Sequence, residues 1–505
     1  MSNVNPALAR ASRQSRLWLL PLLAVVALVY LYWSSAGRLD AGWEWPAYSA
    51  YFDLLAEGFR RGQLSLPIDP APELLAAPNP YDRAYGRYWL VDATLHDGKW
   101  YLYWGPLPSL LQALVKWVLR IDRLIGDQYL VVGFSLLSTT FGALLIEDLR
   151  QRMFSTVQRW VSMFCILALA LGNPVLYLIS TAGQYQAAIA GGQAGLVAAM
   201  WCAFRAVQGL TPEVTRRRWL ALAGCGLGAA LACRISLGAA AVVIAALTLV
   251  AASWPLPGRW RALLVNACYL GAAPVLSGAA LLSYNWLRFG QWLEFGMTEQ
   301  VSYFEFNLSP RYFLTNLYSY ALSPFELSCR FPYALQSMAQ GPKAVPSWVP
   351  LDREYLLLEP ISGFLYSAPI TWLSPIPLGV AAWHLRDTRR AAWRSYIYCT
   401  LSFAVLGSLT GALVLFVYAA TMRYLADFIY GIFLLAALGA FTAISVLKSP
   451  RARSLAGAVV AAASCVTVLL GLLLGYQGYN DHFQRFNAAL DARLVKSLSV
   501  CALTR

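Results

Sequence analysis

The ionisable residues of this 505-residue chain leave few kinds of chemistry open. Only His96, His384 and His482 occur, and the nine cysteines form no CxxC pair, so a histidine-based zinc site or a Ser-His-Asp triad has little material. No glycine-rich loop follows a strand pattern, which argues against a nucleotide-driven pump. Carboxylates and arginines remain, and these residue types transfer protons and bind phosphate.

The elements that must position these groups are membrane helices. Residues of the hydrophobic types make up 59% of the chain and charged residues only 13%, against about 25% in soluble domains. This composition excludes an ordinary soluble enzyme and a disordered protein. A membrane-spanning helix needs about 20 apolar residues, and the sequence predicts eleven spans: 17–35, 128–146, 161–180, 186–204, 219–233, 236–252, 262–283, 361–383, 395–418, 425–447 and 455–475. Arg234 separates two of these runs, which predicts a tight hairpin there.

The net charge of +14 predicts the orientation of the spans. If the ambiguous apolar stretch 101–119 lies along the membrane surface, one set of short loops carries +15 and the other side −1. The positive-inside rule then places the N-terminus in the cytoplasm and the C-terminus outside. The orientation of the spans therefore explains the excess of positive charge, and nucleic acid is not expected as a partner. The alternative reading of the first run is a signal peptide, but its 19 residues favour an uncleaved span.

The expected organisation is an all-α polytopic membrane protein with two long extracytoplasmic segments that bear interfacial helices. Its parts are a cytoplasmic N-terminus (1–16), an N-terminal membrane module (17–283) with external loop 36–127, an external loop (284–360), a C-terminal membrane module (361–475) and an external tail (476–505). Nearly all the polar mass lies in the external parts, so we expect the chemistry there. Short cytoplasmic loops and an Ala/Leu/Arg-rich composition suggest a bacterial inner membrane.

Local patterns predict structure within the external parts. Apolar residues recur at helical spacing in 47–62, which predicts an amphipathic helix ending at Gly62. Five prolines in 67–82 predict an extended crossing, and an Asp97-Gly98 turn before an aromatic run predicts a short hairpin. The dense aromatic residues fit either the membrane interface or contacts with a sugar or lipid. The two external cysteines fit either one disulfide or two free thiols; they are Cys329 and Cys501.

Four stretches make the chain resemble a GT-C superfamily membrane glycosyltransferase of the bacterial, polyprenyl-phosphate-sugar-dependent kind. They are Asp40 with the following DLLAEGFRRGQLSL, then WGPLPSLLQALVKWVL, YNWLRFGQWLEFG and RYLADFIYGIFLLAALG. The resemblance covers residues 17 to 475 in layout. It implies that a sugar moves, with inversion, from a polyprenyl-phosphate donor to an acceptor hydroxyl on the extracytoplasmic face. A carboxylate would act as general base, and cations would stabilise the departing phosphate.

The resemblance makes Asp40 the first candidate for the base, because it follows the first span by five residues. Glu44, Asp53 and Asp92 are the other candidates. Each has a plainer reading: Asp40 as a solvated loop residue or helix cap, Glu44 as a charge between two interfacial tryptophans, Asp53 on the polar face of a helix, and Asp92 as a turn residue. These alternatives stay open at the level of sequence.

Arg423, Arg288 and Arg234 are the candidates for binding the donor phosphate, since each is expected at the outer end of a span. Arg423 could instead pair with Asp427 one helical turn on, and the other two could extend their side chains to the interface. The loop TAGQYQ (181–186) has no carboxylate, where several relatives carry one. We therefore expect no metal and no other cofactor, although a divalent ion remains possible.

Two other functions fit a chain of this kind. A transporter or flippase for lipid-linked glycans should show repeated halves and ionisable residues at mid-bilayer, whereas these spans carry almost no charge. A non-catalytic protein of envelope assembly would need no general base. The expected partners are the lipid-linked sugar, the bilayer and an acceptor that is a glycan, lipid or protein.

Overall fold

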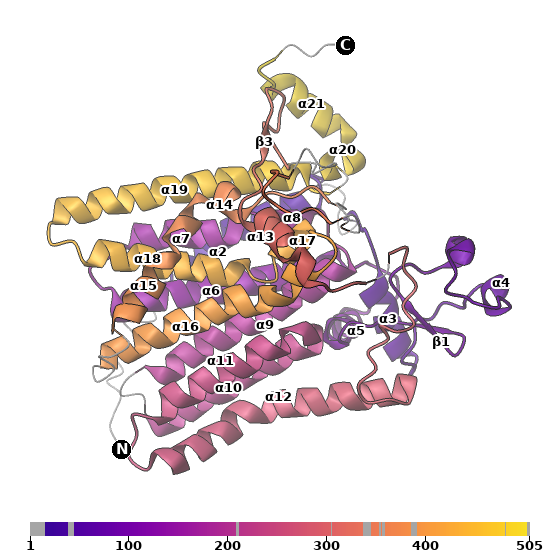
Figure 1. The fold of residues 1–505 in the computed structure, drawn as a ribbon, viewed down its shortest axis with the longest axis horizontal. Coiled ribbons are helices and arrows are strands. Elements are labelled where there is room, and N and C mark those ends of the chain that lie inside the picture. The colour runs from indigo at the N-terminus through magenta and orange to yellow at the C-terminus, as the bar shows by residue number, and fades with distance from the viewer. Residues whose placement is uncertain are drawn as a thin grey trace.

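The structure, a computed structural model, is helical over most of the chain. It describes residues 16–38, 45–208, 212–304, 306–336, 345–352, 355, 359–384, 391–479 and 481–501. Strands within these ranges are limited to two short antiparallel hairpins. Figure 1 shows long helices lying side by side, with loops, short helices and strands gathered at one end of the bundle.

Helices cover all eleven stretches that the sequence predicts to span the membrane. Among the described residues, seven helical stretches are long and apolar enough to cross a bilayer by length and composition. This confirms the predicted class, an all-α multi-pass membrane protein. The helices are α2 (Leu19–Ser34), α6 (Gln128–Met153), α7 (Arg159–Leu171) with α8 (Val175–Ser180), α9 (Gln184–Val207), α10 (Glu213–Cys233), α11 (Gly238–Ser253), α12 (Arg259–Phe289), α14 (Phe364–Ser367) with α15 (Pro375–His384), α16 (Ala391–Ala412), α18 (Ile429–Ser445) and α19 (Pro450–Gln477).

Small residues bring α9 and α10 into backbone contact. A Cβ atom added at Gly195 would lie 2.7 Å from the backbone of Ala230 and of Gly226, so no larger residue fits at this crossing. Close approach through glycine is a common way for membrane helices to pack. Because the two helices run in opposite directions, this contact places the start of α9 next to the end of α10. Both ends contribute to the cavity described below.

The predicted surface helices form, and one prediction needs correction. Helix α3 (Tyr51–Arg60) ends before Gly62, whose φ of +74° stops the helix as expected. Helix α5 (Leu107–Leu119) has 13 residues, which is short for a span, and its Lys116 faces inward while its leucines are exposed. The proline-rich stretch is not wholly extended: α4 (Pro72–Leu75) makes one helical turn, because proline at the first helical position costs no hydrogen bond.

The predicted hairpin joins the two long external segments. Strands β1 (Thr94–His96) and β2 (Lys99–Tyr101) are connected by Asp97 and Gly98, which both have positive φ as a two-residue type I′ turn requires. The chain just before β1 pairs with the second external segment, since the amide of Asp92 donates to the carbonyl of Val301 at 2.9 Å. The amide of Val301 donates in turn to Ala93, also at 2.9 Å. Asp92 and residues 299–301 are therefore fixed to each other.

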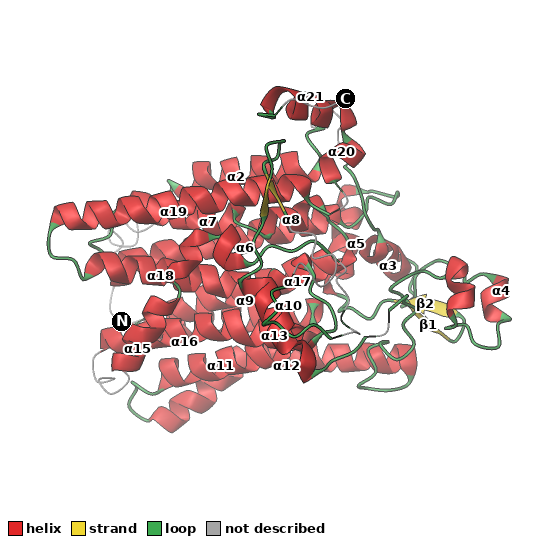
Figure 2. Cartoon of the chain, turned by 45° about the horizontal axis from the view of Figure 1, so that its top comes forward, coloured by secondary structure: helices red, strands yellow, loops and turns green. Residues whose placement is uncertain are grey.

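The C-terminal tail folds back on the same end of the bundle. Helices α20 (His482–Phe486) and α21 (Ala488–Leu498) follow α19 and project to one side (Figures 1 and 2). A disulfide joins Cys329 to Cys501, so the tail is tied to the hairpin of β3 (Glu326–Leu327) and β4 (Ala334–Leu335). Of the two readings left open by the sequence, the structure has the disulfide.

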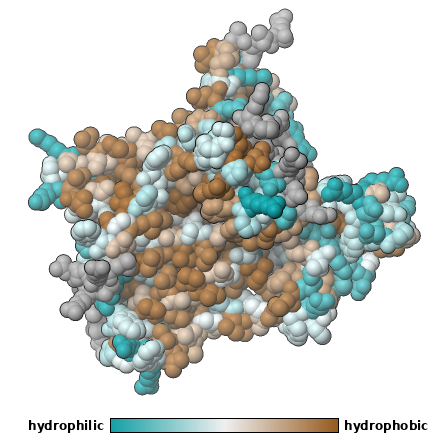
Figure 3. Space-filling view, in the orientation of Figure 1, coloured by the Kyte–Doolittle hydropathy of each residue, from teal (hydrophilic) through white to brown (hydrophobic). Residues whose placement is uncertain are grey.

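The surface is apolar over the helix bundle and polar over the lobe that projects from it (Figure 3). Figure 3 shows hydrophobic residues over the sides of the long helices and hydrophilic residues on the projecting lobe that carries α4 and β1. Helix α12 is the most exposed of the candidate spans, with only 11% of its apolar window buried. A helix that exposes this much apolar surface requires lipid as its solvent.

Candidate functional site

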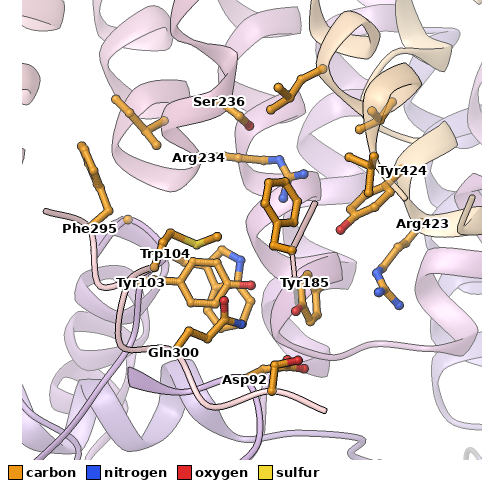
Figure 4. Close-up of a pocket in the computed structure, with 18 of the residues that line it drawn as sticks. Asp92, Tyr103, Trp104, Tyr185, Arg234, Ser236, Phe295, Gln300, Arg423 and Tyr424 are labelled. Carbon is orange, nitrogen blue, oxygen red and sulfur yellow. The ribbon is translucent and has the colours of Figure 1, made fainter. Parts of the chain in front are cut away.

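A cavity of about 430 Å³ opens where the loops meet the helix ends. We call it the aromatic cavity, because Tyr103, Trp104, Tyr185, Tyr284 and Tyr424 form much of its wall. Its lining comes from the start of α9, the turn after α10, the last turns of α12, helix α17 (Met422–Leu425) and the loop around residues 295–306. Segments from both external parts and four helix ends thus meet around one space (Figure 4).

Four residues predicted from the sequence line this cavity together: Asp92, Arg234, Arg288 and Arg423. They lie up to 331 positions apart in the chain, and only folding brings them to one place. Figure 4 shows Asp92 on one side of the space, with Tyr185 and Arg423 beside it and Arg234 across from it. The grouping supplies one carboxylate facing three guanidinium groups.

Asp92 is held in an uncommon backbone conformation. Its φ of +65° lies in the left-handed region, which Asp tolerates better than most residues. The carbonyl of the preceding residue, Val91, accepts a hydrogen bond of 2.6 Å from the Tyr51 hydroxyl. Burial raises the pKa of the Asp92 carboxyl above its ordinary value, and the charge of Arg423 and a hydrogen bond from Tyr185 oppose this rise. A half-buried carboxylate with a raised pKa in a cavity is typical of a proton-transfer site.

Arg423 pairs with Glu359, not with Asp427 as its sequence spacing suggested. Its guanidinium contacts the Glu359 carboxylate and lies 4.5 Å from the centre of the Tyr185 ring. Glu359 is buried and also accepts a hydrogen bond of 3.3 Å from the Tyr177 hydroxyl. The expectation of a pair one turn along the helix fails because α17 ends at Leu425, so Asp427 is not one helical turn from Arg423.

Asp427 instead holds Arg234. The two side chains form an ion pair of 2.8 Å, in which Asp427 is almost fully buried. The side-chain amide of Gln193 in α9 donates to the backbone carbonyl of Asp427. Arg234 is therefore held by Asp427, whose backbone is in turn bonded to α9, and its side chain does not extend freely to the interface.

Arg288 is the arginine of the cavity without an ion pair among the described residues. It is 5% exposed, and its guanidinium carbon lies 3.8 Å from the centre of the Tyr284 ring and 4.5 Å from that of Phe289. It donates to the side chain of Asn285 at 2.7 Å and to the backbone carbonyl of Leu102. These acceptors are neutral, so the positive charge of Arg288 is not compensated by them. A buried charge of this kind favours an anionic ligand.

The other three predicted carboxylates are not seen in the cavity. Asp40 and Glu44 lie outside the described residues, so the structure leaves their roles as predictions. Asp53 is fully buried elsewhere: it pairs with Lys116 at 2.7 Å and accepts the backbone amides of Ile125 and Gly126. With these partners Asp53 joins α3 to α5 and the chain after it, and it does not line the aromatic cavity.

Sequence reasoning missed two residues of the cavity, Glu359 and Tyr185. Glu359 lies two positions before the predicted span 361–383, where a carboxylate is costly unless paired, and this signal could have identified it. Tyr185 belongs to the TAGQYQ loop, and no pattern in the sequence distinguishes it from the many other tyrosines expected at the membrane interface. Across the described ranges, no group of three or more His, Cys, Asp or Glu side chains is placed to hold a metal ion.

Comparison with known proteins gives matches to solved structures alone. No family model and no curated protein matches the chain. An oligosaccharyltransferase from Archaeoglobus fulgidus, tethered to an acceptor peptide with an NVT sequon, is similar with a TM-score of 0.45 and 10% identity over 92% of this chain. ArnT from Cupriavidus metallidurans, bound to undecaprenyl phosphate, has a TM-score of 0.45 and 11% identity, covering 95% of this chain and 79% of ArnT. AglB from Archaeoglobus fulgidus, in complex with an inhibitory peptide and a dolichol-phosphate, has a TM-score of 0.41 and 10% identity over 90% of this chain. The chain spans 56% of the archaeal enzymes that it matches.

Proposed function

We propose that the protein is a membrane glycosyltransferase that moves a sugar from a polyprenyl-phosphate donor to an acceptor hydroxyl on the extracytoplasmic face. One observation carries the proposal: a carboxylate with a raised pKa, Asp92, and three arginines converge on one aromatic cavity at the ends of membrane helices. This is the set of groups that transfer to a hydroxyl with a phosphate leaving group requires. The sequence resemblance to the GT-C superfamily leads to the same reaction.

In the proposed reaction, Asp92 removes the proton from the acceptor hydroxyl as its oxygen attacks the anomeric carbon. The bond from that carbon to the phosphate oxygen breaks on the opposite face, and its electron pair leaves with the polyprenyl phosphate. The configuration of the anomeric carbon is inverted. A positioned general base contributes roughly 10²–10⁴-fold to such a step. Asp40 and Glu44 are the alternative bases from the sequence.

The three arginines have different surroundings, which suggests different roles. Arg423 and Arg234 are held by Glu359 and Asp427, so much of their charge is already balanced. Arg288 brings a positive charge with neutral hydrogen-bond partners into the wall of the cavity. We therefore propose Arg288 as the principal ligand of the donor phosphate, with Arg423 and Arg234 stabilising the charge that develops as the phosphate departs.

Two independent features support an extracytoplasmic cavity. The hairpin that carries Cys329 packs on the last turns of α19, and Tyr479, just beyond α19, lines the cavity; the Cys329–Cys501 disulfide is therefore at the cavity end, and disulfides persist in oxidising compartments. At the other end, the first turns of α10 and α12 carry clustered arginines: Arg216, Arg217 and Arg218 in α10, and Arg259 and Arg261 in α12. Positive residues of this kind mark the cytoplasmic side.

The proposal is tested with purified protein in lipid nanodiscs and a radiolabelled polyprenyl-phosphate sugar. Binding of the donor and release of polyprenyl phosphate are measured for the wild type and for Asp92→Asn, Asp40→Asn and Arg288→Ala. We expect Asp92→Asn to bind donor but to lose turnover, and Arg288→Ala to lose binding. Arg311→Ala is the matched control, because Arg311 is an external arginine that is 77% exposed and outside the cavity.

The outcomes distinguish an error in the proposed enzyme class from an error in the proposed base. Failure of the wild type to bind any polyprenyl phosphate would exclude the whole enzyme class. Full turnover by Asp92→Asn together with its loss in Asp40→Asn would keep the reaction but transfer the role of the base to Asp40.

A further inference from the structure

The β3–β4 hairpin and the end of α21 form one unit at the side of the bundle. The disulfide joins Cys329 at the tip of the hairpin to Cys501, and the amide of Val500 donates to the carbonyl of Cys329 at 2.9 Å. The Phe331 amide donates to the Ser499 hydroxyl at 3.1 Å. We call residues 325–336 and 498–501 the hairpin shelf. Covalent and backbone contacts hold its two parts together as one surface.

The hairpin shelf packs against the last turns of a membrane helix. Ala334 forms a buried cluster with Leu470 and Leu474 of α19, and Phe325 and Leu473 pack against that cluster. Leu474 and Leu470 precede the end of α19 at Gln477 by three and seven residues, which is roughly 5–10 Å along the helix axis. The shelf thus lies beside the outer end of an apolar span, not above it.

The shelf continues the exposed apolar face of α19. Four α19 residues on one helix face are 45–69% exposed, and they are Leu455, Val459, Val466 and Leu469. The next position on this face is Leu473, which is partly buried against the cluster of Ala334, Leu470 and Leu474. The shelf then presents apolar side chains of its own: Leu327, which pairs with Ala334 across the hairpin, is 82% exposed, Val500 83% and Leu498 43%. Exposed leucine and valine at this place extend the lipid-facing surface.

Most of the charged residues around these apolar side chains are basic. Arg330 on the hairpin and Arg493 and Lys496 on α21 are exposed to solvent, as is Glu326 beside Leu327. Apolar residues that enter the acyl region, with Lys and Arg at the level of the headgroup phosphates, are the pattern of an element lying in the membrane interface.

We propose that the hairpin shelf is a lipid-binding surface that inserts into the bilayer leaflet around the cavity end of the bundle. An interfacial element buries about 5–10 Å into the boundary between headgroups and acyl chains, which matches the position of the shelf on α19. Phospholipid is the occupant because the shelf continues a surface that lipid must already cover. The disulfide holds residues 499–501 against the hairpin in this layer.

The test places an environment-sensitive fluorescent amino acid at Leu327 or at Val500. The full-length protein is reconstituted one copy per nanodisc, with and without phospholipid that carries a nitroxide quencher near the headgroup end of its acyl chains. We expect positions 327 and 500 to lose most of their fluorescence to the quencher. Leu75 is the matched control: it is an exposed leucine, at 53%, on α4 of the lobe that projects away from the bundle, and it should keep its fluorescence.

A photo-crosslinking amino acid at Leu327 identifies the occupant directly. Lipid adducts, seen as a mass increase of the monomer, are the expected product in membranes. Quenching at 327 no greater than at 75 would overturn the proposal. Covalent dimers or adducts with another protein in place of lipid adducts would also overturn it, because they would show that a protein covers the shelf.

Discussion

Asp92, which we propose as the general base, lines the cavity, and its backbone is fixed by Val301. Because the base must be deprotonated, activity should be lost as the pH falls through the Asp92 pKa, which burial raises above the ordinary value. The Tyr185 hydrogen bond lowers that pKa, so Tyr185→Phe should move the acidic limb of the pH–rate profile to higher pH. Tyr81→Phe is the control, because its hydroxyl bonds to Leu95 outside the cavity. Coincident limbs for wild type and Tyr185→Phe would contradict the assignment.

Arg288 should determine how tightly the donor phosphate binds. A hydrogen bond to a charged group contributes about 1.5–3 kcal/mol, which corresponds to roughly a 10- to 150-fold change in affinity. We expect Arg288→Ala to weaken polyprenyl-phosphate binding by this factor. Arg288→Lys should recover only part of it, because Lys keeps the charge but loses the planar guanidinium that lies on Tyr284. Titration with polyprenyl phosphate, monitored by native mass spectrometry, measures the affinity of both variants. Equal binding by the alanine variant and the wild type would show that Arg288 is not a ligand of the donor phosphate.

At the scale of elements, the buried pair of Asp53 and Lys116 joins α3 to α5. Replacing one partner of such a pair costs about 3–5 kcal/mol, because the other charge stays buried. We therefore expect Lys116→Met to lower the unfolding temperature strongly and to expose the first external segment to trypsin. Arg60→Met is the control: Arg60 pairs with Glu57 and Asp122 at the surface, where a pair contributes at most about 1 kcal/mol. Similar unfolding temperatures for the two variants would show that the Asp53–Lys116 pair does not stabilise this junction.

The sequence predicted helices and turns better than it predicted contacts between side chains far apart in the chain. Apolar length predicted every membrane stretch, and turn chemistry predicted the Asp97-Gly98 hairpin, because both depend on neighbouring residues. The pairing of Arg423 with Glu359 was missed, since 64 residues separate them and no local spacing encodes a contact across the bundle. The same limit applies to Asp53, whose helical spacing was correct but whose partner Lys116 lies on another helix. Four of the seven predicted site residues nevertheless meet in one cavity.

At the scale of the whole molecule, the proposed orientation predicts which thiols can be reached from outside the cell. A cysteine introduced at Leu75, in a variant with Cys329 and Cys501 changed to Ser, should react with a membrane-impermeant thiol reagent in intact spheroplasts, because Leu75 is 53% exposed on α4 of the projecting lobe (Figure 1). Labelled peptides identified by mass spectrometry provide the measurement. The variant with both cysteines changed to Ser and Leu75 retained is the control for background labelling. Labelling that occurs only after the membrane is permeabilised would reverse the orientation.

The contacts of Arg288 also bear on the order in which the protein is assembled. A chain emerges from the ribosome N-terminus first, so on the proposed topology Leu102 has already crossed the membrane when α12 is synthesised. Its carbonyl is then ready to accept the guanidinium of Arg288 as the end of α12 arrives. On the proposed topology, the contact between α12 and the first external segment therefore forms as the seventh span inserts, through the same side chain that we propose as the phosphate ligand.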